Sequence, residues 1–303
     1  MTLKPKLLLL TALLLSASCA HVQNQGAADK TGPDKNFYIF LCFGQSNMEG
    51  FPGTIEAQDR TVDDRYQLLA AVDFTPGGRY NGPERKKDNW YPAIPPLCRQ
   101  DTGLCPADYF GRTLVANLPK NIKVGVINVA VAGCKIELFD KVNYGTYLAT
   151  AASYQQNDAR LYGGSPYQRL VDMGKEAQKV GVIKGILLHQ GESNSGDRQW
   201  PNKVKGIYDN LLQDLNLKAA DVPLLAGELV ARDQGGATAS MNTIIDDLPK
   251  TIPTAHAISA TGCTKANSLH FNAAGYRLLG TRYGETMLGL LGYKIKQPVD
   301  QPK

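Results

Sequence analysis

Five short apolar runs, separated by amphipathic segments, constrain the fold of this chain more than any other feature. Their near-continuous hydrophobicity is typical of strands that are covered on both faces. Strands that alternate with helices form a parallel sheet with helices on both sides. We therefore predict a three-layer α/β/α sandwich around a parallel sheet of about five strands. The runs are Phe37–Phe43, Val124–Val131, Ile183–His189, Pro223–Leu229 and Thr254–Ser259.

Two of the intervening helices carry start signals. Ser165 stands before Pro166, and Gln168 completes the pattern of a capping box. A second helix is predicted to open at Asn272, because apolar residues follow it at helical spacing to about Leu291.

Two stretches, residues 49–105 and 137–164, are too long to be simple connections. Both are rich in Gly, Pro, Asn and aromatic residues, and each follows a predicted strand. Long loops in compact domains usually carry function, and ligands of parallel sheets bind beyond the carboxyl ends of the strands. We expect these stretches to form the walls of a substrate cleft.

Residues 1–18 have the pattern of an export signal, with lysines before the apolar run Leu7–Leu15 and small residues after it. The run is well short of the ~20 residues that a membrane-spanning helix needs. Cys19 follows at once, and the sequence around it resembles a bacterial lipobox, which predicts acylation of this cysteine. Plain secretion is the alternative. The polar residues 19–35 are predicted to form a flexible tether.

The composition fits one globular domain, which we place at residues 36–295, followed by a tail at 296–303. Of the 303 residues, 43% are hydrophobic and 20% charged, which is ordinary for a globular chain. Without Lys4 and Lys6 of the signal, the 33 basic residues fall to 31, against 28 acidic ones. This near balance gives no support for nucleic-acid binding.

Cysteine usage suggests one disulfide. Cys98 and Cys105 lie seven positions apart around residues that favour a turn, and an exported protein meets an oxidising compartment. We therefore expect a Cys98–Cys105 bridge. Cys42, Cys134 and Cys263 are expected to be buried thiols, and no paired CxxC spacing points to zinc.

A candidate nucleophile follows the first predicted strand, in Gly44-Gln45-Ser46-Asn47-Met48. A serine at a tight turn after a strand can present its hydroxyl over the sheet edge, although by itself such a serine is more often a helix cap. A serine nucleophile needs a base. His189 and His270 both fall where they could reach this edge, and spacing alone does not separate them.

Four ordered segments together resemble the sequence blocks of SGNH hydrolases. More narrowly, they resemble acetylxylan esterases of carbohydrate esterase family six and sialate O-acetylesterases, over residues 36–291. The resemblance implies a flavodoxin-like three-layer fold and ester cleavage by a serine nucleophile, without a metal or other cofactor. The segments are Gly44–Met48, Val129–Cys134, His189–Asn194 and Leu269–Tyr276.

Carried over position by position, the resemblance makes Ser46 the nucleophile and His270 the general base. It implies an oxyanion hole made by the backbone amides of Ser46 and Gly133 and by a side-chain amide of the third segment. We assign that amide to Gln190, with Asn194 as the fallback.

The acid of the triad departs from the usual pattern. Most SGNH hydrolases have Asp three residues before the catalytic histidine, and this chain has Asn267 there. Our hypothesis is a Ser46–His270–Glu192 triad, in which Asn267 at most orients the imidazole. The alternative is a Ser46–His270 dyad, with Glu192 only supporting its loop.

The leading expectation for function is a serine O-acetylesterase that deacetylates a carbohydrate, acetylated xylan first, through an acetyl-enzyme intermediate. A sialate O-acetylesterase is the second candidate. A candidate of another class is a glycan-binding lipoprotein on a non-catalytic esterase scaffold. We expect a periplasmic or cell-surface protein. Aromatic residues of the two long stretches could stack on sugar rings. They are Trp90, Tyr91, Tyr144, Tyr147 and Tyr162.

Overall fold

The structure is a computed structural model that describes residues 1–2, 32–78 and 80–296. Most of the expected export signal and tether, with Cys19, lie outside these residues, as does nearly all of the tail. Within the described ranges, no helix combines the length and the apolar character that crossing a bilayer requires.

A seven-stranded sheet forms the centre of the fold, with the strand order β3-β2-β4-β1-β5-β6-β7. All neighbouring strands pair in parallel except β2 and β3. The five strands that the apolar runs predict are all present. They are β1 (Phe37–Gly44), β4 (Lys123–Ala130), β5 (Val182–His189), β6 (Leu224–Gly227) and β7 (Ala255–Ile258).

The other two strands lie in the long stretch 49–105, where we predicted none. β2 (Tyr66–Leu69) pairs in parallel with β4, and β3 (Trp90–Pro92) pairs antiparallel to β2 at the sheet edge. β3 has three residues and is too short to show a hydrophobic period, whereas β2 is as long as β6 and β7 and was missed although the apolar run Leu68–Val72 begins within it.

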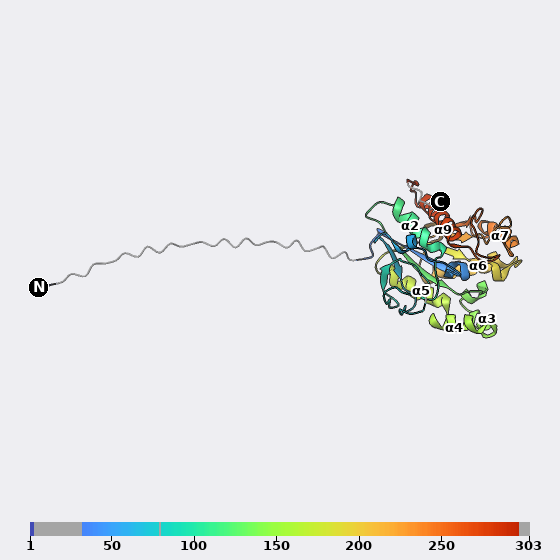
Figure 1. Cartoon of the computed structure of the whole chain (residues 1–303), viewed down its shortest axis with the longest axis horizontal. Coiled ribbons are helices and arrows are strands. Elements are labelled where there is room, and N and C mark those ends of the chain that lie inside the picture. Colours follow the sequence, from blue (N-terminus) through green and yellow to red (C-terminus); the bar gives the residue numbers. More distant parts are fainter. Residues whose placement is uncertain (3–31, 79, 297–303) are drawn as a thin grey trace. The chain divides into compact units, whose positions relative to one another are not determined.

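Helices cover both faces of the sheet (Figure 1). α2 (Pro106–Asn117) and α9 (Ala273–Leu290) pack on one face, and α5 (Pro166–Gln178) and α6 (Trp200–Asp214) pack on the other. Alternate residues of β1 enter the two cores, as the period of two in a strand requires. The predicted three-layer sandwich is therefore confirmed.

Both predicted helix starts are capped. The Ser165 hydroxyl accepts from the backbone N–H of Gln168 at 3.2 Å, but the Gln168 side chain donates to Asp172 instead of returning to the cap. Only half of the capping box forms. At the start of α9, the Asn272 side chain accepts from the backbone N–H of Gly275 at 2.9 Å.

Short helices and 3-10 turns are the other regular elements that the structure describes, and several border the site described below. They are α1 (Ser46–Glu49), η1 (Ala57–Arg60), η2 (Ile136–Phe139), α3 (Tyr144–Thr150), α4 (Ser153–Leu161), η3 (Glu192–Asn194), η4 (Ala219–Asp221), η5 (Ala239–Met241), α7 (Asn242–Asp246) and α8 (Leu248–Thr251).

Two buried arginines fasten the long stretches to the body of the domain. Arg99 forms ion pairs with Glu49 of α1 and with Asp158 of α4, the latter at 3.1 Å. Arg277 of α9 forms an ion pair with the buried Asp59 of η1 at 2.7 Å. Buried charges are costly unless they are paired, so these contacts fix α1, α4 and η1 in place.

The expected Cys98–Cys105 disulfide is wrong, because both cysteines are free and buried. The Cys98 thiol packs against the Tyr162 hydroxyl at 3.2 Å, whereas Cys105 caps α2 with its sulfur 3.6 Å from the Asn128 side-chain amide. The two thiols lie in the same core cluster but contact different groups. The other three described cysteines are also buried free thiols, as expected.

Candidate active site

Ser46 begins α1 directly beyond the end of β1. Gly44 precedes it with φ 152°, and a Cβ on Gly44 would lie 2.1 Å from the carbonyl oxygen of His189 in β5. Only glycine lets the two strands run this close here. The chain therefore turns sharply at the carboxyl edge of the sheet and presents the Ser46 hydroxyl to a pocket.

The Ser46 hydroxyl oxygen lies 2.9 Å from Nε2 of His270, and Nδ1 of His270 lies 3.0 Å from Oδ1 of Asn267. The same Oδ1 accepts from the backbone N–H groups of Leu269 and His270, at 2.9 and 3.0 Å. These donors fix the orientation of the amide, so Nδ1 must carry the ring proton. Nε2 is then a free acceptor that faces the serine.

Burial lowers the pKa of His270 below its ordinary value. The Phe51 ring packs edge-on against the imidazole, with 5.1 Å between the ring centroids. A neutral imidazole bonded to a serine hydroxyl can accept the proton of that hydroxyl, as a general base does in nucleophilic catalysis.

Asn47 holds the backbone on both sides of His270. Its Nδ2 donates to the Leu269 carbonyl at 2.9 Å, and its Oδ1 accepts from the Phe271 N–H at 3.2 Å. The Tyr276 hydroxyl donates to the same Oδ1 at 2.8 Å. The residue after the serine thus clamps the loop that carries the histidine.

Glu192 contacts this clamp and not the histidine. Its Oε1 accepts from Asn47 Nδ2 at 2.5 Å, its Oε2 is buried without a partner among the described residues, and burial raises its pKa to about 7. Asn267 already occupies Nδ1 of His270, and the described structure has no hydrogen bond between Glu192 and that ring. The expected Ser46–His270–Glu192 chain is not formed, and Glu192 reaches the histidine only through Asn47.

Gln190 does not face the pocket, contrary to its expected role as an oxyanion donor. It is 1% exposed, and its Nε2 donates to the side chains of Asn194 and Gln45 at 2.7 and 3.1 Å. Its Oε1 accepts from the indole N–H of Trp200 at 2.5 Å. The fallback Asn194 is also buried and bonded within the protein.

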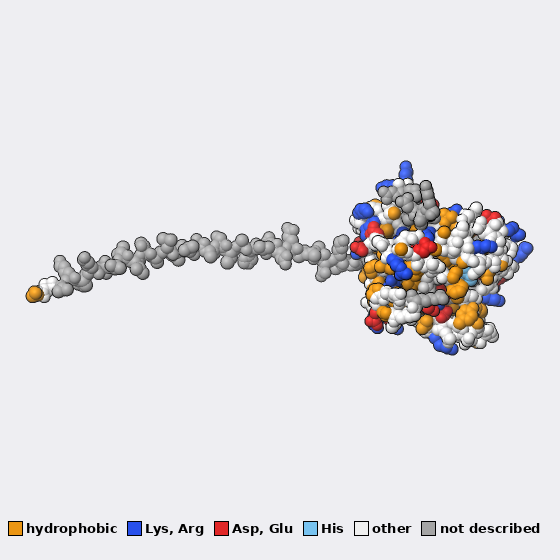
Figure 2. Space-filling view, viewed as in Figure 1, with side chains coloured by type: hydrophobic (Ala, Val, Ile, Leu, Met, Phe, Trp, Pro, Cys, Tyr) orange, Lys and Arg blue, Asp and Glu red, His pale blue; other side chains and the backbone are white. Residues whose placement is uncertain are grey.

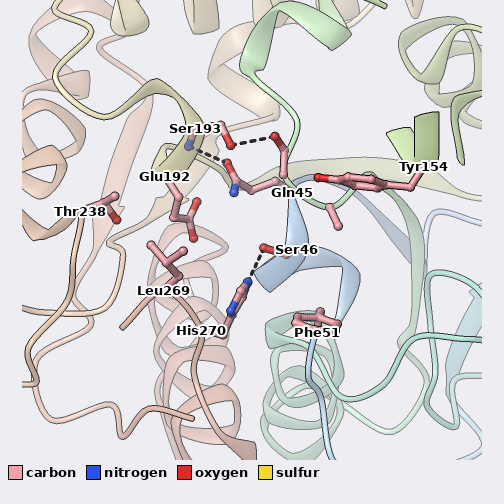
Figure 3. Close-up of a pocket in the computed structure, with 11 residues that line it drawn as sticks. Gln45, Ser46, Phe51, Tyr154, Glu192, Ser193, Thr238, Leu269 and His270 are labelled. Atoms are coloured by element: carbon pink, nitrogen blue, oxygen red, sulfur yellow. Dashed lines mark hydrogen bonds between the residues drawn. The ribbon is translucent and has the colours of Figure 1, made fainter. Parts of the chain in front are cut away.

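The side-chain amide that faces the pocket belongs to Gln45 and not to Gln190. Its Oε1 is fixed by Gln190 Nε2 at 3.1 Å and by the backbone N–H groups of Ser193 and Gly191, at 3.4 and 3.5 Å. Its Nε2 has no acceptor among the described residues and points to the pocket on the side of Ser46 (Figure 3). Sequence reasoning missed it, although it stands within the segment that identified the serine.

Two backbone amides complete this set of donors. No described group accepts from the N–H of Ser46 or of Gly133, and both residues line the pocket. Gly133 has φ 63°, and a Cβ there would lie 2.5 Å from the Tyr154 hydroxyl. Glycine therefore suits this turn for two reasons, its left-handed backbone and the close approach of Tyr154.

The pocket has a volume of about 580 Å³, and two half-exposed aromatic rings stand on its walls (Figure 3). Phe51 and Tyr154 are each 49% exposed. One comes from each long stretch, so both stretches do line the cleft, as predicted. On the face shown in Figure 2, hydrophobic side chains are scattered among charges of both signs.

The aromatic residues that we expected to stack on sugars do not line this pocket. Tyr162 is buried with its hydroxyl near the Arg99 guanidinium, and the Tyr147 hydroxyl bonds to the Lys135 N–H. Of the five expected residues, Trp90, Tyr91 and Tyr144 are likewise absent from the described lining.

His189 is excluded as the base. It is fully buried, its Nε2 lies 3.1 Å from the Glu228 carbonyl oxygen, and burial lowers its pKa to about 4. This contact settles the choice that spacing left open. In the described part of the chain, no group of three or more His, Cys, Asp or Glu side chains could hold a metal ion.

A serine over the carboxyl edge of a parallel sheet, bonded to a histidine from the loop before the last helix, is the arrangement of an SGNH-type serine hydrolase. Residues 36–289 match the family of carbohydrate esterases described as sialic acid-specific acetylesterases. The chain belongs to this family and is a carboxylic ester hydrolase that acts on carbohydrates.

Three solved structures have the same fold. A protein from Arabidopsis thaliana is 19% identical with a TM-score of 0.63, over 84% of this chain and 99% of its own. NanS is 17% identical with a TM-score of 0.64, over 86% and 99%. A carbohydrate acetylesterase from Xanthomonas citri is 16% identical with a TM-score of 0.55, over 83% and 56%.

Proposed function

We propose that this protein removes O-acetyl groups from a sugar by nucleophilic catalysis at Ser46. The observation that carries the proposal is the chain of hydrogen bonds from Ser46 through His270 to Asn267, which opens into the pocket. His270 takes the hydroxyl proton while Ser46 Oγ bonds to the acetyl carbon. As the ester C–O bond breaks, the same proton passes from His270 to the sugar oxygen.

The acetyl group then leaves in a second step of the same kind. Water attacks the acetyl carbon of the acetyl-enzyme while His270 removes a proton from the water, and His270 returns that proton to Ser46 Oγ as the bond between Oγ and the acetyl carbon breaks. Acetate and the free serine hydroxyl result. Because Nδ1 of His270 stays bonded to Asn267, the ring keeps one orientation through both steps.

Three donors suit the oxyanion of both tetrahedral intermediates. They are the backbone N–H groups of Ser46 and Gly133 and the side-chain Nε2 of Gln45, each without an acceptor among the described residues. Trp200 fixes the amide of Gln190, which in turn fixes that of Gln45. The Gln45 donor is thereby oriented before substrate binds, which is the condition for strong electrostatic stabilisation.

The substrate that we propose is an acetylated sugar held between two aromatic rings. Phe51 and Tyr154 offer apolar faces to a sugar ring beside the serine. The sequence motifs resemble those of esterases for both substrates, with acetylated xylan placed first, and the description of the family favours O-acetylated sialic acid. Both are tested directly below.

The experiment measures acetate release from acetylated xylan, from O-acetylated sialic acid and from a small acetate ester, with Ser46→Ala as the control. Release from one sugar that disappears in the mutant identifies the substrate class. A chain that cleaves none of the three is not an acetylesterase, and the proposal is then replaced by the non-catalytic glycan-binding protein.

We also propose export, with Cys19 as a lipid anchor. The signal pattern of residues 1–18 and the lipobox-like sequence before Cys19 support it. Wild-type protein is expected in the membrane fraction of an expressing bacterium, and Cys19→Ser is expected in the supernatant. If wild type and Cys19→Ser divided equally between the membrane fraction and the supernatant, Cys19 would not be a lipid anchor.

A further inference from the structure

A second cavity borders the same two segments as the catalytic pocket. Ser193 and Thr238 line the pocket, and Gly196 and Ser240, three and two residues further on, line the neighbouring cavity. The two cavities share no described lining residue, so a substrate that occupies both must extend along these two segments. This cavity has a volume of about 510 Å³.

Arg198 supplies the second cavity with a guanidinium that pairs with no carboxylate of the described residues. Its side chain lines the cavity, is exposed, and has no ion-pair partner among the described residues. Asp197 shares Lys203 with Glu137, at 2.6 and 2.7 Å, and Asp247, which also lines the cavity, pairs with Lys250 at 2.7 Å. None of these carboxylates pairs with Arg198, so its guanidinium can bind an anionic ligand.

The other groups of the cavity suit a sugar. The hydroxyls of Ser240 and Thr243 are exposed and have no hydrogen-bond partner within the described structure. Pro201 and Ile244 supply apolar surface beside them. The cavity thus offers one guanidinium, two hydroxyls and an apolar patch, and such a set can bind an acidic sugar through its carboxylate, hydroxyls and ring carbons.

We propose that this cavity is a subsite for the carboxylate of an acidic sugar, with Arg198 as its partner. The inference rests on the proposed acetylesterase function and extends it to substrate choice. A guanidinium can bind a carboxylate through two parallel hydrogen bonds, which gives orientation as well as affinity. The carboxylate can belong to a sialic acid or to a uronic acid attached to xylan, because both present the same group.

The kinetic test compares Arg198→Gln with the wild type on matched substrates. These are O-acetylated sialic acid and its carboxyl methyl ester, and acetylated xylo-oligosaccharides with and without glucuronic acid. On the acidic substrate, Arg198→Gln should lower kcat/KM by about 10- to 100-fold, mostly through KM, as expected for loss of a charged hydrogen bond. On the uncharged partner the change should stay within about twofold.

The control is Arg160→Gln, which removes an exposed arginine of α4 that lines neither cavity and should leave every rate unchanged. Which acidic substrate responds identifies the source of the carboxylate. If Arg198→Gln lowers kcat/KM equally for the acidic and the uncharged substrates, or changes it for neither, the proposed subsite is contradicted.

A binding experiment tests this inference independently of the proposed function. Calorimetry with Ser46→Ala measures the binding of sialic acid and of glucuronic acid, neither of them acetylated, before and after the Arg198→Gln change. Binding of either acid that weakens by tenfold or more supports the subsite even if the wild type hydrolyses no acetate ester. Failure of both acids to bind at millimolar concentration overturns the subsite, while hydrolysis of a small acetate ester would still support the esterase.

Discussion

The imidazole Nδ1 of His270 lies 3.0 Å from the side-chain oxygen of Asn267, the residue three positions before it. The amide sets the tautomer and the orientation of the ring, which is one of the two tasks of a triad carboxylate. It supplies no negative charge to stabilise the imidazolium of the transition state. His270 consequently stays neutral to lower pH than it would beside a carboxylate.

The first prediction concerns the pH dependence of the reaction. The base acts as neutral imidazole, and burial lowers the pKa of His270 below 6.5, so activity is retained as the pH falls to that lowered pKa. The acidic limb of kcat/KM against pH should lie below 6.5. A limb above the ordinary histidine pKa would contradict the geometry at Asn267.

Replacing Asn267 by Asp should move the acidic limb of kcat/KM to higher pH. A carboxylate against Nδ1 stabilises the charged ring, so Asn267→Asp should raise the limb by about one pH unit or more and increase kcat on the alkaline plateau. Asn267→Leu, which neither orients nor charges the ring, should lower kcat. An unchanged pH profile in Asn267→Asp would show that this side chain does not act on the base.

Gln45→Met should lower kcat by about 10²- to 10³-fold with little change in KM, because it removes a donor that strengthens its bond only in the transition state. Gln190→Met is the matched control. It removes one of three donors to Gln45 Oε1, so its effect should be smaller. A larger fall in kcat for Gln190→Met than for Gln45→Met would indicate that Gln190 is the oxyanion donor.

Glu192→Gln should separate two roles of that carboxyl in catalysis. If Glu192 acts only by holding Asn47, the glutamine keeps the accepting oxygen and kcat should fall by less than about tenfold. Loss of a triad acid costs ~10⁴-fold. A loss of that size would restore the Ser46–His270–Glu192 hypothesis. Glu192→Ala, which removes the accepting oxygen as well, should be the more damaging change.

The same substitution should alter the pH dependence of stability. Burial raises the folded pKa of Glu192 to about 7 from 4.5, so between these values the folded state binds more protons and stability falls as the pH rises. Glu192→Gln removes this loss. Chemical denaturation should show the mutant gaining up to ~3 kcal/mol relative to the wild type between pH 5 and pH 8. An equal difference at both pH values would contradict the raised pKa.

The strands predicted from local signals were found, because five buried strands appear as continuous apolar runs. The Ser46–His270 pair was predicted from the resemblance of four segments taken together, since neither residue is identified by its own segment alone. The orientation of a side chain has no such signal. Gln45, Gln190 and Asn194 are all amides in matching segments, and only the donors that fix each amide determine which one faces the pocket.

The pocket walls depend on contacts between distant residues, which no local pattern records. Tyr154 stands at the pocket because the buried Arg99 pairs with Asp158 on the same short helix. Nothing in the composition of residues 137–164 separates Tyr154 from Tyr147 or Tyr162. The cysteine spacing gave a wrong prediction for a similar reason, since Cys98 and Cys105 are close in sequence but their thiols contact different groups, the hydroxyl of Tyr162 and the side-chain amide of Asn128.

The central claim is that Ser46 carries the acetyl group during turnover, and trapping the intermediate tests it most directly. The enzyme is mixed with its acetylated sugar, quenched with acid within milliseconds, digested and analysed by mass spectrometry, with Ser46→Ala alongside. We predict one acetyl group on the peptide that contains Ser46, and neither adduct nor acetate release in the mutant. Acetate release by Ser46→Ala at the wild-type rate would contradict the account.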